Sequence, residues 1–264
     1  MKRFEYFKLN FNMAKNETMI ATILAFIAPI IASLGEKESI RSFLMGTDGP
    51  SMLQMIAGLI ILAIAVAVLI KGIIKISYDS FVSENAQIYA ALPISLSDAA
   101  LIKITVLSIN MLILLLGLVV GMTTAWIFGN NEVINSLFDV IFSLITSEKI
   151  EHIAIVPASI IAVVVFVFYI NGIIFSSYCG YLSSHRKPKG SKGKGVTFVK
   201  VVIVAVIFIG IMFKPCMELL FYMAYNDYID SLWIGILGVT GVYGVVGSIQ
   251  FGICVFKLNE EYYM

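Results

Sequence analysis

The hydrophobic positions of this chain form long charge-free runs, separated by shorter polar segments. About 20 residues of helix cross the hydrocarbon core of a bilayer, so runs of this length predict membrane spans. None shows the sustained alternation of a membrane barrel strand, and backbone groups in lipid then require helices. We therefore expect an all-α integral membrane protein with six transmembrane helices, at 18–35, 51–75, 103–128, 153–180, 196–213 and 231–256.

The segments between these runs predict three further elements. Residues 1–17 place three phenylalanines on one helical face, typical of an amphipathic helix in the inner interface, with a frayed tail as the alternative. Residues 80–95 predict a short cytoplasmic helix. Residues 214–230 hold a proline and several tyrosines, which indicates a re-entrant or interfacial helix on the outer side. No loop is long enough for a separate domain, so 1–264 reads as a single transmembrane domain.

Composition supports a membrane protein and excludes other classes. The chain is 59% hydrophobic and 13% charged, and a soluble domain of this size has no room to hide so much apolar surface. The net charge of +1 gives no support for a nucleic-acid partner. The three cysteines are scattered, so we expect neither a disulfide framework nor a zinc site.

The positive charges predict the orientation. If the N-terminus is cytoplasmic, most of the 18 Lys and Arg residues fall in cytoplasmic segments. The exceptions on the other side are Lys37, Arg41, Lys149 and Lys214. This asymmetry favours cytoplasmic positions for both termini.

Catalytic and metal-binding patterns are missing from the sequence. The interiors of the six runs hold no Asp, Glu, Arg or His. The orientation puts His152 and His185 on opposite sides, so they share no metal ion, and no spacing joins Ser, His and Asp into a triad motif. The phosphate-loop pattern is also absent. We expect no enzyme, no metal and no cofactor in this chain.

The stretch "SENAQIYAALPISLSDAALIK" at 83–103 lies between the second and third spans. Pro93 ends the short helix before it, and Ser95 with Asp98 matches the capping box at the start of a helix. Lys103 is expected to anchor the inner boundary of the third span. On physical grounds alone, two readings stay open, a well-made connection or a docking helix for a cytoplasmic partner.

This stretch resembles the cytoplasmic loop of type-2 ATP-binding-cassette (ABC) transporter permeases. The family places an acidic residue before a short helix, then a Leu-Pro-[Ile/Val]-Ser corner, then a Lys at the next span. Here these are Glu84, Leu92-Pro93-Ile94-Ser95 and Lys103. Six spans and an amphipathic N-terminal helix extend the likeness along the chain. One departure is that no basic residue follows Pro93, where the family usually carries one.

The resemblance implies that residues 80–95 form a coupling helix seated in a separate ATPase subunit. Glu84 would make a polar contact there, Ile88 and Leu92 would be apolar anchors, and Pro93 and Ser95 would stiffen the corner. ATP and Mg would be bound by that ATPase. A complete transporter would hold two ATPase subunits and two permease subunits, identical or related.

The expected function is therefore that of a permease subunit in an ABC exporter of the bacterial cell membrane. Uncharged spans favour amphipathic or hydrophobic cargo, with antimicrobial or cytolytic peptides preferred over lipids. The alternative is a membrane scaffold or an intramembrane enzyme that uses no ATP. In the last span, Gly244, Ser248 and Gly252 have the spacing of close helix packing, within one subunit or between two.

Overall fold

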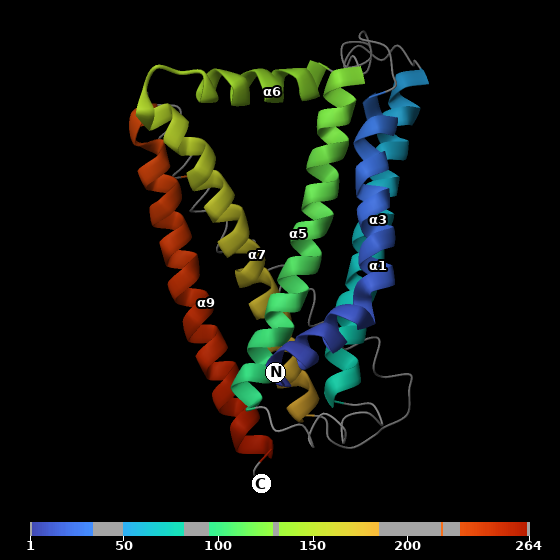
Figure 1. The fold of residues 1–264 in the computed structure, drawn as a ribbon, viewed down its shortest axis with the longest axis vertical. Helices are drawn as coiled ribbons and strands as arrows, with labels where there is room; N and C mark the ends of the chain where they lie inside the picture. Colours follow the sequence, from blue (N-terminus) through green and yellow to red (C-terminus); the bar gives the residue numbers. More distant parts are fainter. Residues whose placement is uncertain are drawn as a thin grey trace. The chain divides into compact units, whose positions relative to one another are not determined.

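The computed structural model describes residues 2–33, 50–81, 95–128, 132–184, 218 and 228–262. Every regular element in these ranges is helical (Figure 1). The elements are α1 (Lys2–Ser33), α3 (Pro50–Phe81), α5 (Leu96–Phe128), α6 (Glu132–Ile145), α7 (Ile150–Ser184), the 3-10 helix η1 (Tyr228–Ser231) and α9 (Leu232–Tyr262).

Five of the described helices are long and apolar enough to cross a membrane. They are α1, α3, α5, α7 and α9, and each coincides with a predicted span. The prediction of an all-helical chain with several membrane-length helices is thus confirmed for the described residues. The predicted span at 196–213 lies outside these residues, as does most of the segment at 214–230.

The predicted interfacial helix and first span form one continuous helix. α1 begins at Lys2 and ends at Ser33, with no break near residue 17. It continues through Pro29, whose ring removes one backbone hydrogen bond of the helix. The two predicted segments therefore differ in composition and not in secondary structure.

The chain divides into two compact units, each described by its own contacts. Unit 1 comprises Met1–Phe7, Ser77–Ser108 and Ile145–Met264, and unit 2 comprises Lys8–Ile76 and Ile109–Leu144. Both α1 and α5 contribute residues to both units.

Close helix packing in unit 2 depends on glycines that face α1. A Cβ placed on Gly58 of α3 would lie 2.8 Å from the carbonyl oxygen of Ala28. A Cβ on Gly121 of α5 would collide with the backbone of Phe26. Small residues let helix backbones approach in this way. The small-residue spacing in the sequence predicts close packing in the last span and gives no indication of Gly58 or Gly121.

A short helix that follows the third span, α6, also belongs largely to unit 2. α6 is held against the end of α5 by aromatic rings: Trp126 stacks on Phe138 at 4.8 Å between centroids and lies 5.6 Å from Phe142. Its 14 residues are too few to cross a bilayer.

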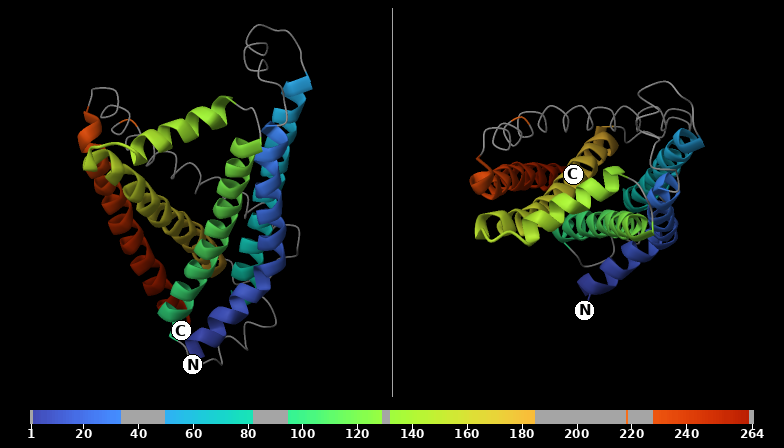
Figure 2. Two further views of the ribbon diagram at one scale, coloured as in Figure 1. Left: turned by 45° about the horizontal axis from the view of Figure 1, so that its top comes forward. Right: turned by 90° about the horizontal axis from the view of Figure 1, so that it is seen from above.

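In unit 1, α7 and α9 lie side by side (Figure 1, Figure 2). The buried residues between them are Tyr169, Ile173 and Tyr243. The ring centroids of the two tyrosines are 5.0 Å apart, and Phe166 meets Tyr243 edge to face at 5.5 Å. Such pairs add to the apolar burial that joins the helices.

Candidate functional site

α5 begins at a capped corner. The Ser95 hydroxyl accepts a hydrogen bond of 3.2 Å from the backbone N–H of Asp98, and the Ser95 carbonyl accepts the first helical bond from Ala99 at 3.0 Å. This is the N-cap geometry that satisfies one orphan donor of the first turn. The predicted cap at Ser95 is therefore confirmed. The other predicted coupling residues, Glu84, Ile88, Leu92 and Pro93, lie outside the described residues.

The carboxylate of Asp98 pairs with a residue near the N-terminus of the chain. Arg3 in the first turn of α1 donates a hydrogen bond to Asp98 Oδ2 at 2.8 Å. Both residues belong to unit 1. The Arg3 side chain is well exposed, so this ion pair positions the two helix starts more than it stabilises them. The sequence holds no local signal for it, because the residues are far apart in the chain.

Lys103 is buried, with only 1% of its surface exposed. It was expected to anchor the inner boundary of a span, where a long cationic side chain ordinarily extends toward water. A buried ammonium is costly unless it is paired, and Lys103 does take part in an interaction within the structure. The burial of Lys103 was not foreseen from the sequence, and it immediately precedes a residue of the pocket described next.

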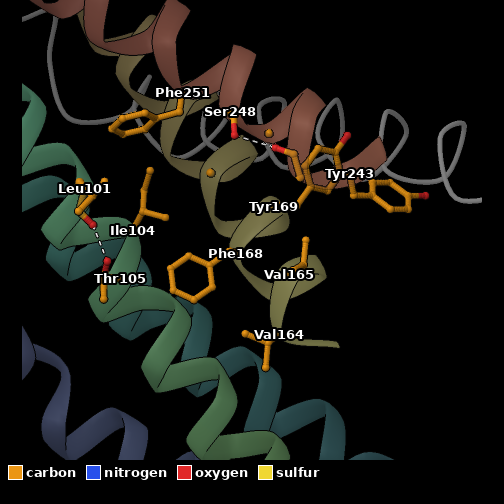
Figure 3. Close-up of a pocket in the computed structure, with 13 residues that line it drawn as sticks. Leu101, Ile104, Thr105, Val164, Val165, Phe168, Tyr169, Tyr243, Ser248 and Phe251 are labelled. Atoms are coloured by element: carbon orange, nitrogen blue, oxygen red, sulfur yellow. Dashed lines mark hydrogen bonds between the residues drawn. The ribbon is translucent and has the colours of Figure 1, made fainter. Parts of the chain in front are cut away.

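A pocket of about 440 Å³ lies between three helices of unit 1. It is lined by three residues of α5 and by residues on one face each of α7 and α9, namely Leu101, Ile104, Thr105, Val164, Val165, Phe168, Tyr169, Gly172, Tyr243, Gly244, Gly247, Ser248 and Phe251. Figure 3 shows Ile104 and Phe168 reaching into the space between α5 and α7. The pocket is open on one side, and its volume lies in the range of small-molecule sites.

The two aliphatic hydroxyl groups of the pocket are already used within their own helices. Thr105 donates its hydroxyl hydrogen to the Leu101 carbonyl, and Ser248 donates to the Gly244 carbonyl, both at 2.8 Å (Figure 3). Neither hydrogen is therefore available to a ligand. The remaining lining is dominated by aliphatic and aromatic side chains.

The predicted packing residues of the last span have different surroundings. Gly244 and Ser248 line the pocket, and the nearest neighbour of a Cβ at Gly244 would be Val165 at 4.0 Å. A Cβ at Gly252 would meet nothing within 4 Å. The tightest approach on this helix is instead at Gly247, where a Cβ would lie 3.2 Å from the ring of Tyr169.

A second polar cluster joins the start of α7 to η1, and we call it the clasp: Ser147, Lys149, His152 and Asp230. Lys149 Nζ lies 3.1 Å from both carboxylate oxygens of Asp230, and His152 Nε2 lies 2.9 Å from Oδ1. The hydrogen bonds from Lys149 and His152 hold the pKa of Asp230 below its ordinary value of 3.8. The clasp thus carries an ionised carboxylate at neutral pH.

The clasp also contains a hydrogen-bonded series of Asp, His and Ser. The Ser147 hydroxyl lies 3.0 Å from His152 Nδ1, while the opposite ring nitrogen faces Asp230. This is the order of groups in a serine hydrolase triad, but with the two ring nitrogens exchanged, because Ser meets Nε2 and Asp meets Nδ1 in the triad. The same hydroxyl accepts the backbone N–H of Lys149 at 3.2 Å, and Lys149 also neutralises the carboxylate. The ion pair between Lys149 and Asp230 weakens the interaction of the carboxylate with the imidazole of His152. The arrangement therefore suits a structural link better than a catalytic base.

No group of three or more His, Cys, Asp or Glu suited to a metal ion occurs among the described residues. No protein-family model, curated protein or solved structure matches this chain.

Proposed function

We propose that this chain is the membrane subunit of an ATP-driven exporter, powered by a separate ATPase. One observation carries the proposal: the α5 wall of the pocket directly follows the capped corner at Ser95. Leu101, Ile104 and Thr105 line the pocket within the first turns of the helix that Ser95 begins. A force applied before Ser95 therefore acts on the pocket through a single helix.

The capped start of α5 would let a movement before Ser95 reach the pocket without unwinding the first turn of the helix. The Ser95 cap and the Ser95–Ala99 backbone bond keep the first turn from fraying. The Arg3–Asp98 pair links the same turn to the start of α1. In the proposed machine, residues 80–95 form the coupling helix. Glu84, Ile88 and Leu92 contact the ATPase, which itself binds ATP and Mg.

The pocket supports amphipathic or hydrophobic cargo, with antimicrobial or cytolytic peptides as the preferred class. Its lining offers apolar side chains and no charged group. The distribution of Lys and Arg supports an orientation with both termini in the cytoplasm of a bacterial cell. A second membrane subunit, identical or related, would complete the transporter.

Co-purification with an ATPase tests this proposal. The tagged chain is purified from its native membranes, and the phosphate-loop ATPase that co-purifies with it is quantified. We expect Leu92→Asp to lose the ATPase, because a charge replaces an apolar anchor. The matched control is Leu137→Asp on the exposed face of α6, which should retain it. Equal retention by both variants, or none by the wild type, would contradict the proposal.

One observation favours an intramembrane enzyme as a second candidate function, namely the Ser147–His152–Asp230 series. A serine-reactive fluorophosphonate probe tests it on the purified protein. Labelling that disappears in Ser147→Ala and in His152→Ala would support a hydrolase. We expect no such labelling.

A further inference from the structure

We infer that the pocket between α5, α7 and α9 binds an alkyl chain. Binding itself does not require an ATPase. Only the description of the bound molecule as exported cargo rests on the proposed function.

The chemistry of the lining favours an apolar ligand, because most of the lining side chains are hydrocarbon. Leu101, Ile104, Val164 and Phe168 present hydrocarbon to the space. The hydroxyl groups of Thr105 and Ser248 donate to their own helices, so neither offers a hydrogen to a ligand. The other polar groups among the lining side chains are the phenol hydroxyls of Tyr169 and Tyr243. Beside Ile104, Val164 and Phe168, water would find few of the two to four polar partners that it needs. A ligand with a buried polar group would lose its hydrogen bonds without replacement.

The shape of the pocket suits an extended chain better than a compact ring. Its wall on α9 runs from Tyr243 to Phe251, a rise of roughly 12 Å at the helical advance per residue. The wall on α7, from Val164 to Gly172, has the same length. An extended chain advances about 1.2 Å per bond. The walls therefore match an alkyl chain with a backbone of about ten bonds.

The three helices around the pocket would bring it into contact with the hydrocarbon chains of a membrane. α5, α7 and α9 are all long and apolar enough to cross a membrane, so hydrocarbon chains are the molecules that surround them. The open side gives a chain a way in. Two sources share this chemistry: the acyl chain of a membrane lipid and the alkyl tail of an amphiphile delivered as cargo.

Gly172 offers a way to fill the pocket without disturbing the fold. It lines the pocket, and a Cβ placed on it would meet nothing within 4 Å. Gly172→Leu therefore directs a side chain into the free space. The matched control is Gly241→Leu on α9, where a Cβ also meets nothing within 4 Å but which does not line the pocket. Gly244→Leu fills the pocket from α9 as a second variant.

The experiment uses the full-length chain in lipid nanodiscs and palmitic acid carrying a diazirine along its chain. After photolysis, the labelled positions are mapped by mass spectrometry. We expect labels concentrated at 101–105, 164–172 and 243–251, relative to the exposed residues Leu59 and Ile60 of α3 as a background. Gly172→Leu and Gly244→Leu should each lower pocket labelling by about tenfold, while Gly241→Leu leaves it unchanged.

Competition separates the sources. Displacement by unlabelled palmitic acid alone assigns the site to free fatty acids, and displacement by lysophosphatidylcholine as well assigns it to acyl chains whatever their headgroup. Displacement only by an amphipathic peptide without an acyl chain would overturn the inference in favour of peptide side chains. Labelling no higher than at α3, or equal in all variants of unchanged thermal stability, would also overturn it. Because no ATPase is present, none of these results depends on the proposed exporter.

Discussion

Lys149 Nζ lies 3.1 Å from both carboxylate oxygens of Asp230, which ties the start of α7 to the 3-10 turn before α9. We expect Asp230→Asn to lower the Tm of the purified protein slightly, since the pair is exposed to solvent. The matched control is Asp139→Asn on an exposed position of α6, which should leave the Tm unchanged.

The same carboxylate gives a pH dependence with a defined sign. Because pairing lowers the pKa of Asp230 in the folded protein, its contribution is fully present above the ordinary value of 3.8. The contribution is lost as the pH falls through the lower pKa of the folded state. The difference in Tm between wild type and Asp230→Asn should therefore shrink in strongly acidic buffer. A difference that grows as the pH falls below 3.8 would contradict this sign.

Gly121 should tolerate no side chain. A methyl group there would collide with the backbone of Phe26, and overpacking of this kind costs about 1–3 kcal/mol. Gly121→Ala should lower the Tm measured by scanning fluorimetry in detergent. Gly241→Ala, with open space at its Cβ, should be neutral or stabilise α9 by up to about 1 kcal/mol. Equal Tm values would show that α1 and α5 do not approach this closely.

Lys103 should resist chemical modification in the folded protein. Only 1% of its surface is exposed, whereas more than half of the Lys149 side chain is exposed. A water-soluble amine-reactive ester should modify Lys149 readily and leave Lys103 intact until the protein is unfolded. Mass spectrometry of the digested protein measures both sites in one sample. Comparable modification of the two lysines before unfolding would contradict the observed burial.

Removing the cap of α5 should weaken its first turn. Ser95→Ala leaves the backbone N–H of Asp98 without its side-chain acceptor, at a cost of about 1 kcal/mol. Faster amide exchange should appear in the first turn and decline further along the helix. Ser97→Ala is the control, because the hydroxyl of Ser97 contacts that of Ser95 without capping the helix. Unchanged amide exchange in Ser95→Ala would show that the Ser95 hydroxyl does not stabilise the first turn of α5.

The features that sequence predicts here are those encoded locally. Long apolar runs predicted five of the described helices, and Ser95 with Asp98 predicted the cap because both groups lie within one turn. The clasp was missed because Asp230 and His152 are 78 positions apart, and no periodicity signals such a pair.

Glycine positions show the same limit. A small-residue spacing marks Gly244, yet the tight contacts occur at Gly58 and Gly121. Spacing identifies where close approach is possible, but only the neighbouring helix decides where it happens. Lys103 shows a related limit, because a charge at the end of an apolar run predicts a span boundary, whereas only tertiary packing decides that the side chain is buried.

In the proposed exporter, ATP energy enters before Ser95 and reaches the pocket through α5. The most direct test of this proposal is the ATP hydrolysis rate of the reconstituted complex, measured with and without an amphipathic peptide. We expect peptide to stimulate hydrolysis with the wild-type chain and with Leu137→Asp. Stimulation should fall about tenfold or more with Leu92→Asp, the effect of losing a single apolar anchor at an interface. Undiminished stimulation with Leu92→Asp would contradict the account.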